Sequence, residues 1–118
     1  MKNRQIEVKA ITTEDKTEQY KLLYGKTSKG LKEMAGEVIK VINHARYDVV
    51  TEMDDGEYRT SHCLAIMGED GNVYVTTSPT AIFDFTGIVE FFGDNPTIKI
   101  VAKKSAKNKE FITIDIAQ

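Results

Sequence analysis

The stretch VYVTTSPTAIFDFTGIVEFFGDNPTIKIVAKK, residues 73–104, decides the expected fold because it reads as strand, helix and strand in turn. Its first residues alternate apolar and polar side chains, which is typical of a strand with one buried face. Ser78 and Pro79 suit the N-cap and the first position of a helix, and Gly93 suits its end. The last residues again carry isoleucine at alternate positions. We therefore expect one helix between two strands.

Further strands are predicted on both sides of this stretch. Residues 38–53 form a long β-branched run, which ends at a predicted hairpin turn where Gly56 supplies the positive φ. Residues 57–67 form the returning strand, and residues 111–116 alternate isoleucine with other side chains. The order of three strands, one helix and two strands is that of the five-stranded OB barrel, a fold that commonly binds single-stranded nucleic acid or oligosaccharide.

The chain divides into two predicted parts. Residues 36–118 form the OB-fold domain, and residues 1–35 form an N-terminal extension of one or two short strands. The first of these strands alternates over residues 5–11, and the second covers residues 20–24. The predicted fold class is therefore all-β with one helix, a five-stranded OB barrel that carries a short β extension.

Composition limits the class of protein. The chain has 118 residues, of which 41% are hydrophobic and 29% charged, so we expect one soluble globular domain. No apolar run approaches the roughly 20 residues that span a bilayer, and the start lacks a signal-peptide core, which favours the cytoplasm over a membrane. The net charge of -2 argues against a duplex-DNA binder. It leaves open a single-strand binder with a local basic groove.

Motifs of catalysis and metal binding are missing from the sequence. There is no P-loop, no dinucleotide-binding glycine pattern, no HExxH and no CxxC. The only cysteine, Cys63, lies in an apolar run and is interpreted as a core residue. The paired acids at 54–55 and 69–70 precede turn glycines, so turn chemistry explains them. We therefore expect no enzyme, no metal site and no cofactor.

The last two predicted strands place aromatic and basic side chains together. If the isoleucines of residues 111–116 face the core, Phe111 points outward. On residues 97–104 the even positions form the best core set, which leaves Lys99 and Lys103 outward. Single-strand binding needs this combination, because bases stack on rings and phosphates pair with cations.

Three tyrosines extend the predicted surface. If Val73 and Val75 face the core, Tyr74 points outward. Tyr58 lies on the more polar face of its strand, so it is also expected to point outward. Tyr47 has the parity of buried positions, so it reaches the surface only if a bulge reverses the parity of the first strand. The predicted stacking residues are Tyr47, Tyr58, Tyr74 and Phe111, and the predicted phosphate partners are Lys40, Arg46, Arg59, Lys99, Lys103, Lys104, Lys107 and Lys109.

Three segments resemble one known family. Residues 67–74, MGEDGNVY, join an acidic glycine turn to a tyrosine-bearing strand, residues 45–47 read Ala-Arg-Tyr, and the chain ends in two strands around a Lys/Ser/Asn turn. This pattern resembles the small single-stranded-DNA-binding proteins of phages that replicate by protein priming. The resemblance implies cooperative coating of displaced strands during replication, with Tyr47 and Tyr74 as stacking residues. A single-strand binder of a conjugative plasmid or another mobile element fits almost as well.

We therefore expect a protein that binds single-stranded DNA without strong sequence preference and protects displaced strands in phage or mobile-element replication. Its expected partners are the single strand, replication proteins and further copies of itself along the strand. The alternative is a small β-barrel interaction module of a phage or plasmid that docks on a host or replication protein, a reading that the negative net charge favours.

Overall fold

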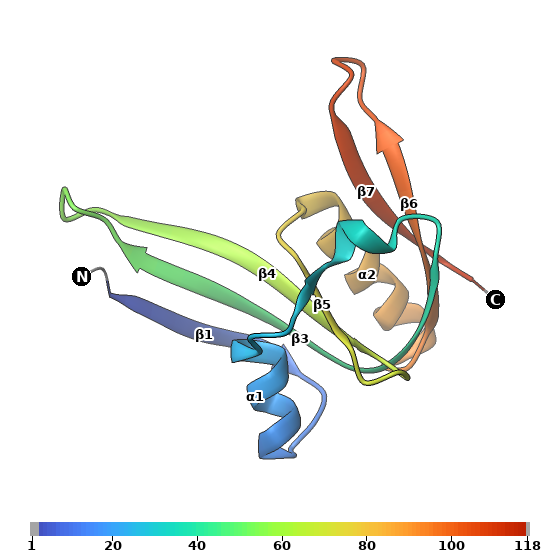
Figure 1. The fold of residues 1–118 in the computed structure, drawn as a ribbon, viewed down its shortest axis with the longest axis horizontal. Coiled ribbons are helices and arrows are strands. Elements are labelled where there is room, and N and C mark those ends of the chain that lie inside the picture. Colours follow the sequence, from blue (N-terminus) through green and yellow to red (C-terminus); the bar gives the residue numbers. More distant parts are fainter. Residues whose placement is uncertain (1–2, 118) are drawn as a thin grey trace.

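The computed structural model describes residues 3–117, which form a mostly β structure with two α-helices. Its sheet is curled and open, as in an OB-like barrel (Figure 1). The strands are β1 (Arg4–Ile11), β2 (Lys29–Gly30), β3 (Val38–Glu52), β4 (Tyr58–Gly68), β5 (Val73–Thr76), β6 (Thr97–Lys104) and β7 (Glu110–Ile116). The helices are α1 (Lys16–Tyr24) and α2 (Pro79–Phe92), and a 3-10 turn covers Leu31–Met34.

From β3 to β7 the elements follow the predicted order of three strands, one helix and two strands. The predicted ends of α2 are confirmed. Ser78 Oγ accepts a hydrogen bond from the Ala81 N–H at 3.3 Å, and Pro79 is the first helical residue. Gly93 ends the helix with a φ of 86°, which a residue with a side chain rarely adopts.

The sheet has the strand order β2-β5-β4-β3-β6-β7, and β1 pairs with the outer half of β3. Among the described strands, β2 and β7 stand at the two ends of this order, so the sheet stays open between them. Two hairpins project from the barrel in different directions. One is β3–β4 with β1 beside it, called the arm below, and the other is β6–β7 (Figure 1). The molecule is flat, with extents of 46 × 42 × 25 Å.

The N-terminal extension differs from the prediction. The strand over residues 5–11 is present as β1, but the strand predicted over residues 20–24 is wrong, because these residues belong to α1. Asp15 caps this helix by accepting a hydrogen bond from the Glu18 N–H at 3.0 Å. Leu22 is 1% exposed and packs on the sheet. The cap and this buried contact favour a helix, so the described residues form two α-helices instead of the one predicted.

A bulge in β3 divides the core into two layers. The register between β3 and β4 shifts between Val41 and Asn43. Odd-numbered residues of β3 therefore point to one face of the sheet before the bulge and to the opposite face after it. Ile39 packs on the side that α2 covers, called the α2 side below, in a core with Phe85. Tyr47 packs on the opposite side, called the α1 side below, in a second core with Leu22. Both faces of β3 and β4 are therefore covered where they pass the helices.

Candidate nucleic-acid interface

The β6–β7 hairpin carries the predicted combination of ring and cation. Lys103 lies directly opposite Phe111 in the antiparallel register, on the outer side of the hairpin. The isoleucines of the other parity are buried, at 0% exposure for Ile100 and 4% for Ile114. The predicted orientation of these two strands is therefore confirmed. Phe111 is half-buried and Lys103 is exposed, so a ring and a cation share one surface.

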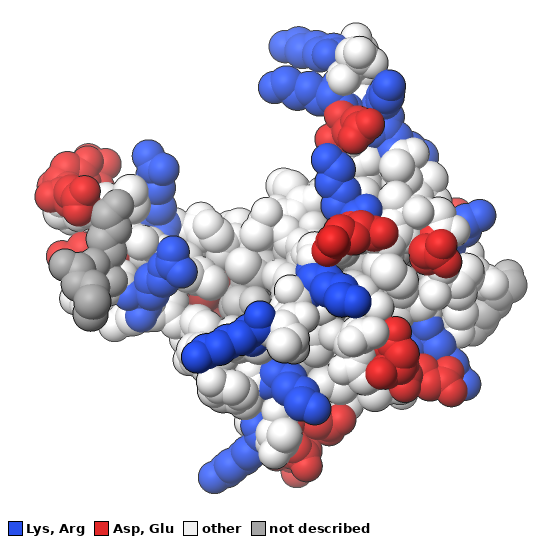
Figure 2. Space-filling model, in the orientation of Figure 1, with Lys and Arg blue, Asp and Glu red and all other residues white. Residues whose placement is uncertain are grey.

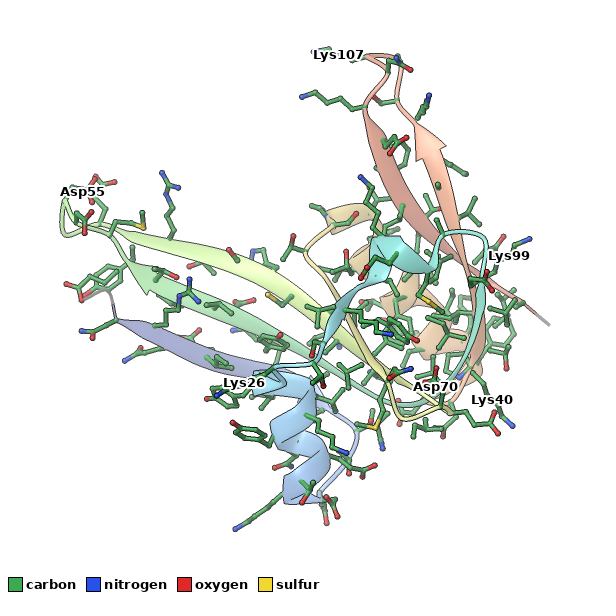
Figure 3. All side chains as sticks on the ribbon, viewed as in Figure 1. Lys26, Lys40, Asp55, Asp70, Lys99 and Lys107 are labelled. Atoms are coloured by element: carbon green, nitrogen blue, oxygen red, sulfur yellow. The ribbon has the colours of Figure 1, made fainter. Side chains whose placement is uncertain are left out.

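The turn of this hairpin concentrates positive charge. Residues 103–109 contain four lysines and no acid. The turn is ordered by its own hydrogen bonds, because the Asn108 N–H donates to Ser105 O at 2.9 Å and the Lys109 N–H donates to Ser105 Oγ at 3.2 Å. Figure 3 shows Lys107 at the tip, far from the barrel. The lysines of this turn that the structure leaves exposed are Lys103, Lys104, Lys107 and Lys109.

The arm places its predicted residues on two sides of its sheet. Tyr58 is 68% exposed and lies at the start of β4 on the α2 side, opposite Glu52. Arg59 points to the α1 side, where it lies opposite Thr51. Arg46 is half-buried on the α2 side, and its Nη1 donates to Thr86 Oγ1 at 3.4 Å. The arm therefore offers one exposed ring and cations on both sides.

Two predicted stacking residues are buried. Tyr47 is 6% exposed, and its burial raises the pKa of the phenol to about 12. The bulge does reverse the parity of β3, but α1 covers the side to which Tyr47 then points. Tyr74 is 3% exposed, so the predicted outward orientation is wrong. The barrel core takes up Tyr74, whereas its neighbour Val73 is buried on the α1 side.

The remaining predicted cations, Lys40 and Lys99, lie on neighbouring strands at a separate place. In Figure 3 both are at the side of the barrel, well away from Lys107. Lys40 also lies 3.9 Å from Glu69, between Nζ and Oε2, in an exposed ion pair. The structure therefore does not bring all predicted phosphate partners together. It gathers those of residues 103–109 at the hairpin turn and separates Lys40 and Lys99 from them.

A groove opens where the arm meets the start of α2. Its volume is about 580 Å³. On the α2 wall Phe83 is 80% exposed, beside Pro79 and Ile82, and Thr60 and His62 belong to the wall formed by β4. The arm and the β6–β7 hairpin extend on either side of this groove, which is called the notch below (Figure 1). In the predicted OB order, β4 and the two hairpin turns take the places of strand 2 and the loops 1–2 and 4–5, which belong to the usual ligand surface of that fold.

Sequence reasoning missed Phe83. In α2 the apolar residues 81, 85, 88 and 92 recur at helical spacing, and the first two are buried, at 0% exposure for Ala81 and 1% for Phe85. Phe83 and Phe91 lie out of phase with that stripe, eight residues apart on a different side of the helix. The missed signal was this second row of aromatic residues, because a helix with one buried face should carry polar residues there.

Two histidines lie on the same side of the sheet. His62 Nδ1 is 2.7 Å from Asp48 Oδ1, and the side chain of His62 is largely exposed. His44 is buried against Phe85, and burial lowers the pKa of its imidazole. Within residues 3–117 no three His, Cys, Asp or Glu side chains are grouped closely enough to hold a metal ion. His62 thus supplies a hydrogen bond at the groove, and His44 supplies packing against α2.

Comparison with known proteins gives one match. The family model described as phage single-stranded DNA-binding protein, of the phi29 type, matches residues 1–117. The chain belongs to this family. Its members are DNA-binding proteins and not enzymes, and the match supports single-stranded DNA binding in a phage. No curated protein and no solved structure shows a significant match. In the described part of the chain, neither helix has the length and apolar character to cross a membrane.

Proposed function

We propose that the protein binds single-stranded DNA without strong sequence preference and coats displaced strands during the replication of its phage or mobile element. The observation that carries this proposal is the β6–β7 hairpin, where Phe111 faces Lys103 beside a turn with three more lysines. Across the notch, Tyr58 offers a second exposed ring. A single strand that lies in the notch would contact both hairpins at once.

The chemistry of this surface supports binding without strong sequence preference. Rings accept any base by stacking, which contributes about 1–3 kcal/mol per base, and lysines contact phosphates, which every sequence shares. The hairpin lysines thus provide attraction along the backbone, whereas Tyr58, Phe83 and Phe111 provide stacking surfaces. We propose that the protein acts in replication, where it binds two further partners: the replication proteins and neighbouring copies of itself on the same strand.

The test is a tyrosine-fluorescence titration with oligo(dT), repeated at several salt concentrations. The chain has no tryptophan, so its five tyrosines give the signal. We expect bases to quench the fluorescence of the exposed tyrosines until the site is saturated. The affinity should fall with salt, and a plot of log affinity against log salt concentration should have a slope of about -0.7 per neutralised phosphate. An unchanged signal, together with no shift of labelled oligonucleotide in a gel, would rule out this function.

The outer side of α2 favours a second candidate function, docking of a replication or host protein. Phe91 is 88% exposed and Phe92 is 55% exposed, and a groove of about 350 Å³ lies between them and Ile114. Residues 78–96 contain three acids and no lysine or arginine, which disfavours contact with phosphates. An apolar patch with acidic neighbours fits a protein surface with apolar side chains and a basic rim.

The two functions are separable by one substitution. Phe91→Ser changes an exposed side chain away from the notch, so we expect unchanged affinity for oligo(dT). If α2 docks a replication protein, the variant should fail to stimulate strand-displacement synthesis by the polymerase of the same element. Stimulation equal to that of the unsubstituted protein would remove the docking function and leave single-strand binding in place.

A further inference from the structure

The N-terminal segment covers the strand face that OB barrels normally offer to their ligands. In this fold the ligand lies on strands 2 and 3, which here are β4 and β5. On the α1 side Cys63, Ala65 and Val73 are buried together with Leu22 of α1. A DNA strand that approaches this face therefore meets α1 and the residues that follow it, instead of β4 and β5.

The outer side of α1 carries a row of one lysine and two tyrosines. Lys16, Tyr20 and Tyr24 are spaced four residues apart, so they are neighbours along one side of the helix. Tyr20 is 57% exposed and Tyr24 is 55% exposed. Their ring centroids are 5.7 Å apart with 25° between the ring planes. Two near-parallel, exposed rings form the kind of platform on which bases stack.

The only carboxylate of α1 points away from this row. Glu18 Oε1 accepts a hydrogen bond from Thr13 Oγ1 at 2.8 Å, and Glu18 Oε2 accepts one from Asn43 Nδ2 at 3.2 Å. These bonds hold the carboxylate against β3. The exposed charges of the helix are therefore those of Lys16 and Lys21 alone.

The residues after α1 add more positive charge at the same place. Residues 16–32 contain five lysines and one acid, in a chain whose net charge is -2. The chain turns back closely at Gly25, where a Cβ would lie only 2.4 Å from Lys21 O. Figure 3 accordingly shows Lys26 beside the end of α1. Among the described residues, no carboxylate forms an ion pair with Lys21, Lys26 or Lys29.

The β6–β7 hairpin and the arm carry further cations on the same face of the molecule. Lys32 Nζ lies 3.6 Å from Glu110 Oε2, which connects the segment after α1 to the first residue of β7. Arg4 and Arg59 both lie opposite Thr51, so they share the α1 side of the arm. Figure 2 shows Lys and Arg side chains on one face of the molecule, at the hairpin, over α1 and on the arm.

We propose that Lys16, Tyr20, Lys21, Tyr24, Lys26 and Lys29, called the α1 strip, form a second contact surface for the same DNA strand. The inference rests on the proposed function and extends the site beyond the notch. Bases stack on the outer faces of Tyr20 and Tyr24, and the lysines contact the phosphates between them. The N-terminal segment therefore replaces the strand face that it covers and lengthens the stretch of DNA that one protein binds.

The test compares the unsubstituted protein with the double variants Tyr20→Ala/Tyr24→Ala and Tyr20→Phe/Tyr24→Phe. Binding to fluorescently labelled oligo(dT) of increasing length is followed by anisotropy. We expect the alanine variant to bind long oligonucleotides about five-fold or more weakly, while the shortest oligonucleotides that bind are affected little. The phenylalanine variant keeps both rings and should match the unsubstituted protein at every length.

A second variant tests the lysines without touching the packing of α1. Lys21→Gln/Lys26→Gln/Lys29→Gln should make the log–log salt slope shallower by up to about 2, since each neutralised phosphate contributes about 0.7. Lys9→Gln is the control, because Lys9 lies 3.9 Å from Glu7 and 3.8 Å from Asp48 and is not part of the strip. We expect this control to leave the slope unchanged.

The outcomes separate the inference from the function on which it rests. If the alanine variant equals the unsubstituted protein at all lengths, or the triple glutamine variant keeps its salt slope, the α1 strip does not bind DNA and the notch remains the site. If the phenylalanine variant loses as much affinity as the alanine variant, stacking is not the cause and the inference fails. If the unsubstituted protein does not bind oligo(dT), the proposed function itself fails.

Discussion

The Tyr74 hydroxyl donates a hydrogen bond to Asp70 Oδ2 at 3.2 Å, and so connects β5 to the turn that precedes it. Asp70 Oδ1 also accepts from the Asn72 N–H at 2.9 Å. These hydrogen bonds, that of the Asn72 backbone first, lower the pKa of Asp70. The acidic turn and the tyrosine that support the family resemblance therefore form one structural unit, with the ring inside the barrel core.

Tyr74→Ala should be a stability variant. Removing a buried aromatic ring costs about 3–5 kcal/mol, so we expect a fall in melting temperature of more than about 10 °C. Tyr74→Phe keeps the ring and loses one hydrogen bond, with an expected cost of about 0.5–1.5 kcal/mol. Circular dichroism during heating measures both. An alanine variant that melts like the unsubstituted protein but binds DNA poorly would place the ring in the interface instead.

Tyr58→Ala should have the opposite effect. The ring is 68% exposed, so its loss should change the free energy of unfolding by no more than about 0.5 kcal/mol. If a base stacks on it, the affinity for oligo(dT) should fall by about 1–3 kcal/mol. Tyr58→Phe is the matched control and should bind normally. Anisotropy titrations of the two variants would refute a stacking role if both bind as tightly as the unsubstituted protein.

The orientation of the β6–β7 hairpin was predictable because nothing interrupts its pairing. The register runs without a shift from Ile98 opposite Ile116 to Lys104 opposite Glu110, so simple alternation holds along both strands. One buried face and one open face then follow from the isoleucines. The same reasoning placed Lys103 and Phe111 on one surface, where the structure has them.

Alternation failed for Tyr74, and the bulge did not bring Tyr47 to the surface, because β3 to β5 are covered on both faces. An argument from parity assumes that one face of a strand is open, and the N-terminal segment removes that condition here. The covering element itself was also predicted wrongly. Residues 16–24 have no strong apolar stripe, and the helix depends on the Asp15 cap and on the tertiary contact of Leu22.

The hairpin lysines should determine much of the salt dependence of DNA binding. For Lys107→Gln/Lys109→Gln we expect a log–log slope shallower by up to about 1.4, because each neutralised phosphate contributes about 0.7. Both side chains are exposed, so the melting temperature should hardly change. The variant is compared with Lys9→Gln in titrations at several salt concentrations. Equal slopes for the two proteins would show that the strand does not contact the hairpin turn.

Tyr47 should make the folded state sensitive to alkaline pH. Its folded pKa is about 12, raised by burial above the ordinary value of 10.0. Below the pKa of the unfolded chain, the phenol is protonated in both states, so its titration does not reduce the free energy of unfolding. As pH rises from there toward 12, only the unfolded state loses the proton, so stability decreases.

Tyr47→Phe should abolish this part of the pH dependence. For the unsubstituted protein we expect this residue to cost about 1.4 kcal/mol of unfolding free energy between about pH 9 and pH 11. Urea unfolding at both pH values measures the loss, and the difference between the two proteins cancels the titration of lysines common to both. Tyr58→Phe should lose as much stability as the unsubstituted protein, because its ring is exposed. A Tyr47→Phe variant that loses just as much would mean that the Tyr47 phenol ionises freely and is not held in the second core.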